Sequence, residues 1–318
     1  MEIQGPTVVI SGESAKAYAE LVKDRFPDLR VIQAPDASSL EKHIAEAEVL
    51  LGFRFPVEVF DKASKLRWFQ STGAGVDSLF PIRDRIGHIT VTNARGIHGE
   101  VIADYVMAAV TMLHWDFRGF LHDQANKRWR PRPVSPLSDK TIGVVGLGSI
   151  GATIARRAKS AGMIVLGSKR DVTVPVDGVD ELFAPDGMVD MLPRCDFVVL
   201  ALPATPDTVG FFGPAEIACM RPDAYLINIA RGSVIVEAEL IKALQRGAIA
   251  GAMLDVFEQE PLPPTSPLWT MPNVIVTPHT AGYPANYETR SFSVFADNLK
   301  RYMGGQELMN IVDMKRGY

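Results

Sequence analysis

Three glycines in the middle of this 318-residue chain have the spacing of a dinucleotide site. Gly146, Gly148 and Gly151 form a G-x-G-x-x-G pattern between the apolar, β-branched run 141–145 and a helical pattern that begins at Ser149. The first glycine permits a tight turn, the second leaves the backbone open to a pyrophosphate, and the third lets strand and helix pack closely. A helix N-terminus offers free N–H groups and the positive end of its dipole to phosphates. The pattern therefore predicts dinucleotide binding, with an ordinary glycine turn as the alternative.

The residues after the next expected strand indicate which dinucleotide binds. A site for NAD usually has an acidic residue about 20 positions beyond the glycines, where it binds the ribose 2′-hydroxyl. This chain has Ser168, Lys169 and Arg170 there, and Lys169 lies 18 residues beyond Gly151. A hydroxyl and two cations suit a 2′-phosphate, so we predict that the preferred cofactor is NADP(H). NAD(H) stays an alternative because Asp171 follows, and because the two cations could simply be solvated.

Three ionisable residues in the second half each follow an apolar run that we expect to be a strand. Arg231 follows L-I-N-I-A, Glu260 lies in D-V-F-E-Q-E-P, and His279 lies in V-I-V-T-P-H. Because the carboxyl ends of strands in a doubly wound sheet open on one crevice, these side chains can meet although they are far apart in sequence.

The types of these three residues suit hydride transfer to a 2-keto acid. A guanidinium can bind a carboxylate with two hydrogen bonds and can polarise a keto oxygen. An imidazolium can donate a proton to that oxygen, and a neighbouring carboxylate favours the protonated imidazole. Singly, each residue would more often be an ion pair or a surface group. Together, in a dinucleotide-binding domain, Arg231, Glu260 and His279 predict a catalytic site.

Composition and charge exclude several other classes of protein. The net charge of −4 and the pI of about 5.9 do not indicate a nucleic acid or an anionic membrane as a partner. A hydrophobic content of 47% indicates a globular protein with an ample core, and no apolar run approaches the roughly 18 residues of a membrane span. Cys195 and Cys219 lack metal-site spacing, so we expect buried thiols and no metal. These features, and an N-terminus without a basic signal region, predict a cytoplasmic protein.

The elements that would position the candidate residues alternate between strand and helix. In the first hundred residues this alternation predicts a parallel α/β domain, with a helix at 38–47 that is opened by a capping box of Ser38 and Glu41. One long helix is expected from Glu100 to about residue 125, and a last helix, 286–303, could return to the first domain. Further strands of the glycine-containing unit are expected at 195–202, 225–229, 250–255 and 273–277.

Five stretches of the second half are similar to the motifs of a known family. They are G-L-G-S-I-G (146–151), I-N-I-A-R-G (227–232), G-A-M-L-D-V-F-E-Q-E-P-L-P (251–263), S-P-L-W (266–269) and T-P-H-T-A-G (277–282). Over nearly its whole length the chain resembles the D-isomer-specific 2-hydroxyacid dehydrogenases. The resemblance implies an α/β fold of two domains, in which a Rossmann doubly wound parallel sheet is inserted in a flavodoxin-like substrate domain. The expected boundaries are 100–284 for the dinucleotide-binding domain and 1–99 plus 285–318 for the substrate domain.

The resemblance also implies a role for each residue that matches a family motif. Arg231 would orient the substrate, Glu260 would pair with the histidine, and His279 would be the general acid and base. The N–H groups of Ala74 and Gly75, in S-T-G-A-G-V-D-S (71–78), would bind the substrate carboxylate with Arg231 beside His279. From the residues alone that stretch is a glycine-rich turn with a modest anion-binding signal. The residues expected to contact the cofactor are Gly146, Leu147, Gly148, Ser149, Ile150, Gly151, Ser168, Lys169, Arg170, Leu202, Pro203, Thr208, Ile229, Ala230, Asp255 near the nicotinamide, and Gly282.

One departure from the family pattern indicates a subgroup. NAD-using members have an acid where this chain has Lys169, and the run G-S-K-R resembles that of the NADPH-dependent glyoxylate/hydroxypyruvate reductases. We therefore expect reduction of a small 2-keto acid by NADPH to a D-2-hydroxy acid. The alternatives are a same-fold dehydrogenase with another substrate, such as a larger 2-keto acid, formate or phosphite, or a dinucleotide-sensing binding protein. The family also implies a homodimer formed through the cofactor domain and the segment 100–136.

Overall fold

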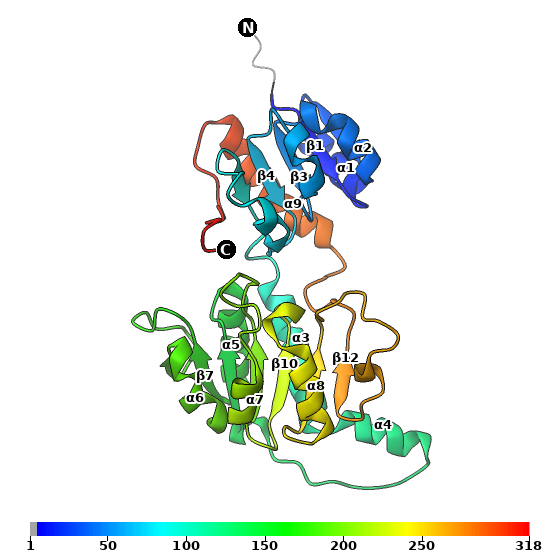
Figure 1. Ribbon diagram of the computed structural model, residues 1–318, viewed down its shortest axis with the longest axis vertical. Coiled ribbons are helices and arrows are strands. Elements are labelled where there is room, and N and C mark those ends of the chain that lie inside the picture. Colours follow the sequence, from blue (N-terminus) through cyan, green and yellow to red (C-terminus); the bar gives the residue numbers. More distant parts are fainter. Residues whose placement is uncertain (1–4, 318) are drawn as a thin grey trace. The chain divides into compact units, whose positions relative to one another are not determined.

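The computed structural model describes residues 5–317, and the chain divides into two compact units (Figure 1). The first unit combines the chain up to Ile97 with the chain from Pro284 onward, and the second unit is His98–Tyr283. Each unit contains one sheet, and neighbouring strands run parallel in both sheets. The predicted α/β fold class is therefore confirmed.

The first unit has a five-stranded sheet in the order β2-β1-β3-β4-β5. Helix α9, Tyr287–Met303, packs beside α1, Ala15–Arg25, over one face of this sheet. Trp68 stacks on Phe295 of α9 with ring centroids 5.3 Å apart, and both rings are buried, so segments from both ends of the chain share one core. The strands are β1 Val8–Ser11, β2 Val31–Ala34, β3 Val49–Gly52, β4 Trp68–Ser71 and β5 Thr90–Thr92. The other face is covered by α2 Ala37–His43 and the 3₁₀ helices η1 Ile44–Glu46, η2 Val57–Lys62 and η3 Asp77–Ile82.

Helix α2 begins one residue earlier than the sequence predicts, and it has a different cap. The Asp36 carboxylate accepts a hydrogen bond from the Ser39 N–H at 2.8 Å, and the Ser39 hydroxyl accepts one from the Asp36 N–H at 3.2 Å. The predicted capping box of Ser38 and Glu41 is wrong, because an earlier carboxylate makes the same reciprocal pair. Glu41 forms an ion pair with Lys62 instead.

The second unit has a seven-stranded sheet in the order β12-β11-β10-β9-β6-β7-β8. The first strand of this unit, β6, lies in the interior of the sheet, with β7 on one side and β9 on the other. The direction of winding therefore reverses between β6 and β9, and open sheets of this kind bind ligands beyond the carboxyl ends of the strands at such a point. The strands are β6 Thr141–Val145, β7 Ile164–Ser168, β8 Glu181–Phe183, β9 Phe197–Leu200, β10 Tyr225–Asn228, β11 Gly251–Leu254 and β12 Val274–Val276.

The strand register brings the candidate residues of this unit to one edge of the sheet. Val145 of β6 is level with Ser168 of β7 and with Leu200 of β9. Leu200 is in turn level with Asn228 of β10, which is level with Leu254 of β11. The turns that carry the glycines, the two cations and the three ionisable residues therefore all leave the sheet at this edge.

Helices cover both faces of the second sheet (Figure 1). Helices α3 Gly99–His114 and α5 Ser149–Ser160 pack together on one face. The other face is covered by α6 Met188–Met191, α7 Pro214–Cys219 and α8 Glu237–Gln245. The 3₁₀ helices are η4 Leu137–Asp139, η5 Pro185–Gly187, η6 Leu192–Arg194, η7 Gly232–Val234 and η8 Pro267–Trp269. No helix within residues 5–317 combines the length and the apolar character needed to cross a membrane.

The single long helix expected from Glu100 is wrong, because the chain breaks it after His114. Helix α4, Phe117–Ala125, follows separately. Asp116 has a φ of +51°, a left-handed conformation that aspartate tolerates better than most residues, and its side chain accepts a hydrogen bond from the Gly119 N–H at 3.0 Å. Asp116 thus ends one helix and caps the next. Strand β8 is also absent from the sequence-based prediction, because three residues are too few to show an alternating pattern.

Candidate functional site

The glycine turn after β6 has the backbone that the sequence pattern requires. Gly146 has a φ of +97°, and a Cβ there would lie 2.7 Å from the carbonyl oxygen of Ala201. At Gly151, in the first turn of α5, a Cβ would lie 1.9 Å from the carbonyl oxygen of Gly146. At Gly148 an added Cβ would meet no atom of the described chain within 4 Å. Two glycines are therefore required by packing, and the third leaves the backbone before α5 accessible, which fits a pyrophosphate.

The loop after β9 lies against the glycine turn. A Cβ on Gly146 would lie 3.0 Å from the Leu202 side chain. The Thr208 hydroxyl donates to the Pro203 carbonyl at 2.6 Å and accepts from the Thr205 N–H at 2.8 Å, so it closes this loop. The predicted cofactor residues Leu202, Pro203 and Thr208 are thus held together at the switch point of the sheet.

The loop after β7 carries the two predicted phosphate-binding cations. Ser168 is buried at the end of the strand, and the Lys169 ammonium donates to the Val174 carbonyl at 2.9 Å. Asp171 accepts hydrogen bonds from the N–H and the hydroxyl of Thr173, at 3.0 and 2.6 Å. These bonds, and the charge of Lys169, lower the pKa of Asp171. Both bonds reach one oxygen, Oδ1, so they anchor the Asp171 carboxylate within its own turn.

The turn after β10 positions Arg231. The Asn228 side chain, which is buried, accepts from the Ala230 N–H at 3.0 Å and donates to the Arg231 carbonyl at 3.2 Å. A Cβ on the next residue, Gly232, would lie 1.8 Å from the carbonyl carbon of Phe257. Glycine at 232 therefore lets this turn cross closely over the segment that leads to Glu260. Ile229 and Ala230, predicted to contact the cofactor, are buried.

Glu260 and His279 form a direct pair. The Nδ1 atom of His279 lies 2.7 Å from Oε2 of Glu260, and Oε1 of Glu260 accepts from the Phe257 N–H at 3.0 Å. Burial alone would raise the pKa of Glu260, but the bonds from His279 and Phe257 and the charge of Arg231 outweigh it, so the pKa lies below its ordinary value of 4.5. An ionised carboxylate can only accept, so Nδ1 of His279 carries a proton and Nε2 is the nitrogen that faces away from Glu260. The structure thus brings the three ionisable residues together.

The turn that carries His279 depends on Asp255, which is 2% exposed. One carboxylate oxygen of Asp255 accepts from the Thr280 N–H and the other from the Ala281 N–H, both at 2.9 Å. The carbonyl of Asp255 accepts from the His279 N–H at 2.8 Å, and His279 has a φ of +50°. Asp255, predicted to lie near the nicotinamide, therefore also shapes the backbone around His279, a contact that sequence reasoning missed.

His98 is a further residue that sequence reasoning missed. It precedes α3 and is 6% exposed, and a Cβ on the predicted cofactor residue Gly282 would lie 3.6 Å from its ring. Burial, with the charge of Arg231 as a second cause, lowers the pKa of His98 to about 4. The imidazole is thus neutral at physiological pH, so it does not repel the positive charge of Arg231. The sequence contains no pattern that would have indicated it.

The predicted substrate loop belongs to the first unit. It follows β4, and hydrogen bonds hold the carbonyl groups of both candidate residues. The side chain of Asn93 donates to the Ala74 carbonyl at 2.8 Å, and the Ser71 hydroxyl donates to the Gly75 carbonyl at 3.4 Å. Among residues 5–317 the structure contains no cluster of three or more histidine, cysteine or acidic side chains suited to a metal.

Comparison with known proteins identifies the family. The model of the NAD-binding domain of D-isomer specific 2-hydroxyacid dehydrogenases matches residues 107–281, which is more than half of the chain. The chain belongs to the D-isomer-specific 2-hydroxyacid dehydrogenase family. It is 32% identical to the glyoxylate reductase of Korarchaeum cryptofilum (strain OPF8), over 98% of this chain and 96% of that protein. The resemblance inferred from the motifs is thereby confirmed, and the chain is an oxidoreductase with a domain for a nicotinamide dinucleotide.

Other members of the family differ in substrate. The chain is also 32% identical to the D-3-phosphoglycerate dehydrogenase of Methanocaldococcus jannaschii, over 86% of this chain, but the match spans about half, 53%, of that protein. The NADPH-dependent glyoxylate/hydroxypyruvate reductase of Sinorhizobium meliloti, solved with NADP and sulfate, is 29% identical and has a TM-score of 0.87. That likeness covers 98% of this chain and 100% of the other. Membership of the family thus establishes the reaction type but does not identify the substrate.

Proposed function

We propose that the protein reduces a small 2-keto acid, of the glyoxylate or hydroxypyruvate type, to a D-2-hydroxy acid with NADPH. The observation that carries the proposal is the cluster of Arg231, Glu260 and His279 at the same sheet edge as a glycine turn that fits a dinucleotide. The names of two relatives support the substrate class. In this proposal the second unit binds the dinucleotide and the first unit is the substrate domain, with boundaries close to 98 and 284.

The three ionisable residues have distinct tasks in the proposed reaction. Bound at the glycine turn, NADPH would supply the hydride for the keto carbon. The Arg231 guanidinium binds the substrate carboxylate and polarises the keto oxygen. The N–H groups of Ala74 and Gly75 keep the carboxylate-binding role that the resemblance implies. Nε2 of His279 donates the proton that the oxygen requires, because its Nδ1–H is already bonded to Glu260. The ionised Glu260 stabilises the imidazolium before transfer and orients the ring throughout.

The preference for NADPH rests on the loop after β7. Ser168, Lys169 and Arg170 supply a hydroxyl and two cations for a 2′-phosphate. Asp171 follows these residues and is anchored in its own turn by Thr173 through one oxygen, Oδ1, so NADH stays the alternative cofactor. The other residues named above from the resemblance keep their proposed contacts with the cofactor.

The decisive test is a panel of 2-keto acids assayed with NADPH and NADH, and of formate, phosphite and 3-phosphoglycerate assayed with NADP⁺ and NAD⁺. The chirality of each 2-hydroxy acid product is resolved. We expect glyoxylate and hydroxypyruvate to be reduced with the highest kcat/KM, with NADPH, and chiral products to be D. His279→Ala should lower kcat by roughly 10²–10⁴-fold. His43→Ala is a matched control, because His43 also places Nδ1 against a glutamate, Glu46, at 3.0 Å but lies in the first unit.

Other outcomes of the panel would contradict the proposal in distinct ways. Higher kcat/KM for a larger 2-keto acid, formate, phosphite or 3-phosphoglycerate would replace the substrate class. A higher kcat/KM with NADH would refute the role given to Lys169. Dinucleotide binding without turnover of any substrate would favour a sensing protein.

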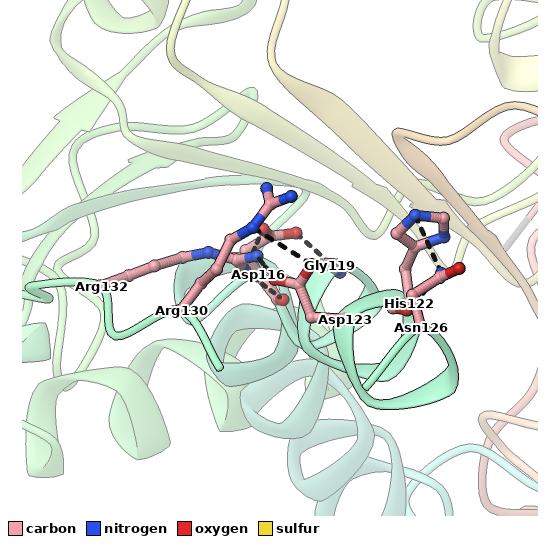
Figure 2. A network of polar contacts seen from close by, with 7 residues as sticks. All are labelled: Asp116, Gly119, His122, Asp123, Asn126, Arg130 and Arg132. Atoms are coloured by element: carbon pink, nitrogen blue, oxygen red, sulfur yellow. Dashed lines mark hydrogen bonds and ion pairs between the residues drawn. The ribbon is translucent and has the colours of Figure 1, made fainter. Parts of the chain in front are cut away.

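We also propose that two copies of the chain form a homodimer through the segment that includes α4. Phe117 and Leu121 of α4 are 42% and 58% exposed, and Trp129 in the next loop is 96% exposed, so apolar surface gathers where a partner would cover it. Figure 2 shows the polar network that holds this loop against α4. Arg132 contacts both Asp116 and the buried Asp123 at 2.5 Å, and Arg130 lies 3.8 Å from Asp123.

Light scattering after size exclusion tests the dimer. Leu121→Glu should produce monomers, because a charge would have to be buried in the interface. Val189→Glu is the matched control, since Val189 is 56% exposed on α6, away from this segment in sequence. A wild-type monomer, or a dimer unaffected by Leu121→Glu, would contradict the proposal.

A further inference from the structure

Three side chains from distant segments form a hydrogen-bonded chain that ends at the turn of His279. The hydroxyl of Tyr105, in α3, lies 2.6 Å from the hydroxyl of Thr277, which follows β12. The Thr277 hydroxyl in turn lies 2.6 Å from a carboxylate oxygen of Asp255, which follows β11. All three residues belong to the second unit.

The chemistry of the three groups gives this chain one direction. A carboxylate accepts only, so the Thr277 hydroxyl must donate to Asp255. Because the single proton of the Thr277 hydroxyl is donated to Asp255, its oxygen can only accept from the Tyr105 hydroxyl, which is therefore the donor. Burial is the main cause that raises the pKa of Tyr105, so its hydroxyl keeps the proton at every pH at which the enzyme would be assayed.

The acceptor at the end of the chain, the Asp255 carboxylate, holds the backbone that follows His279. The same oxygen of Asp255 that accepts from Thr277 accepts from the Thr280 N–H, and the second oxygen accepts from the Ala281 N–H. His279, which precedes Thr280, has a φ of +50°. Such a left-handed conformation is unfavourable for a residue with a Cβ, so the surrounding hydrogen bonds must impose it. A rotation of the Asp255 carboxylate would release this turn.

We propose that Tyr105 and Thr277 are positioning residues for the proton transfer, because they fix the Asp255 carboxylate and through it the backbone that aims the His279 ring. This inference rests on the proposed function, in which His279 donates the proton. Neither hydroxyl is among the groups proposed to bind the 2-keto acid. Their loss should therefore reduce kcat and leave KM for the 2-keto acid nearly unchanged.

The test uses three single variants of the whole chain in steady-state assays. Tyr105→Phe removes the first donor, and we expect kcat to fall about tenfold, in keeping with the sensitivity of rates to small misplacements of a catalytic group. Thr277→Val removes both hydrogen bonds at nearly constant volume and should lower kcat by at least as much. Thr277→Ser keeps the hydroxyl, so its kcat should stay within about threefold of the wild-type value. A threefold change is smaller than the effect expected from the loss of a typical hydrogen bond.

A control and a double variant separate positioning from general stability. Tyr302→Phe removes a tyrosine hydroxyl that lies 2.7 Å from the Glu48 carboxylate in the first unit, and it should leave kcat unchanged. In the background of His279→Ala, Tyr105→Phe should have no further effect on the residual rate, because the group that it positions is gone.

Each result decides between the two proposals. If His279→Ala is as active as the wild type, the proposed function fails. If His279→Ala is impaired but Tyr105→Phe and Thr277→Val keep the wild-type kcat, only the positioning role is overturned. An equal loss from Tyr105→Phe with and without His279 would also overturn it. If Thr277→Val does not fold, Tyr105→Phe and its double variant still decide the question.

Discussion

The pair formed by Glu260 and His279 allows a quantitative prediction for Glu260→Gln. Glutamine has nearly the same shape but only one oxygen, whereas His279 Nδ1 and the Phe257 N–H lie 2.7 and 3.0 Å from two different oxygens of the carboxylate. The substitution therefore removes the negative charge and can keep only one of the two hydrogen bonds. Because only the protonated imidazole is attracted by that charge, the variant should stabilise the imidazolium that donates the proton less than the wild type does.

The size of the change follows from the distance and the exposure of the pair. For unit charges 2.7 Å apart, Coulomb's law gives about 1.5 kcal/mol in bulk water and about 6 kcal/mol at an effective dielectric constant of 20. The side chains of His279 and Glu260 are 37% and 30% exposed, so solvent screening keeps the interaction near the lower value, and we take about 2 kcal/mol. At about 1.36 kcal/mol per factor of ten, this corresponds to roughly a 30-fold loss of stabilisation of the imidazolium.

The assay is kcat/KM for 2-keto acid reduction at neutral pH. We expect kcat/KM to fall by roughly 30-fold in Glu260→Gln, because the group that stabilises the proton donor has lost its charge. Glu258→Gln is the control, because it removes the same charge from an exposed residue two positions earlier. A loss in Glu260→Gln no larger than that in the control would refute the electrostatic role of Glu260.

Three further predictions test other parts of the structure. Lys169→Glu should lower kcat/KM for NADPH by roughly 10- to 100-fold, the equivalent of one charge-assisted hydrogen bond, and raise it for NADH; an unchanged ratio would contradict the phosphate role. Gly232→Ala should destabilise the fold by about 1–3 kcal/mol in chemical denaturation and impair turnover, because its Cβ would overlap Phe257; wild-type stability would contradict the close crossing. Hydrogen bonds from Lys159 and the Val165 N–H hold the pKa of Asp180 below its ordinary value of 3.8. The ionised carboxylate therefore stabilises the fold above pH 3.8, and this stabilisation is lost as the pH falls below 3.8 and the group becomes protonated. Asp180→Asn should therefore lower Tm at pH 7 and lose its effect near pH 3, whereas an equal difference in Tm at both values would exclude the charge as the cause.

The helix boundaries illustrate where local sequence patterns are insufficient. The pattern of α9 is strong enough that its predicted range, 286–303, differs from Tyr287–Met303 by one residue. The break between α3 and α4 was missed, because the helical pattern continues through Asp116 and the left-handed turn there depends on its side chain bonding the Gly119 N–H. Competing capping groups, as at Asp36, are likewise decided by which geometry the folded chain adopts.

The sequence by itself determined the family, the fold class and the glycine turn. The three glycines of that turn lie within six consecutive residues. A positive φ requires Gly146, a close contact with the Gly146 carbonyl requires Gly151, and Gly148 leaves the backbone open. The residue types of Arg231, Glu260 and His279 likewise indicated their chemistry, because few side chains can bind a carboxylate or donate a proton near neutral pH.

Only the tertiary structure decided how those groups are held. The Tyr105 and Thr277 hydroxyls are 172 positions apart in sequence, and they meet because α3 packs on the sheet against β10 and β11, next to the strand that leads to Thr277. The neutral state of His98 likewise arises from burial beside Arg231. Hydrogen bonds and desolvation of this kind depend on packing between distant elements, and no local pattern of residues encodes them.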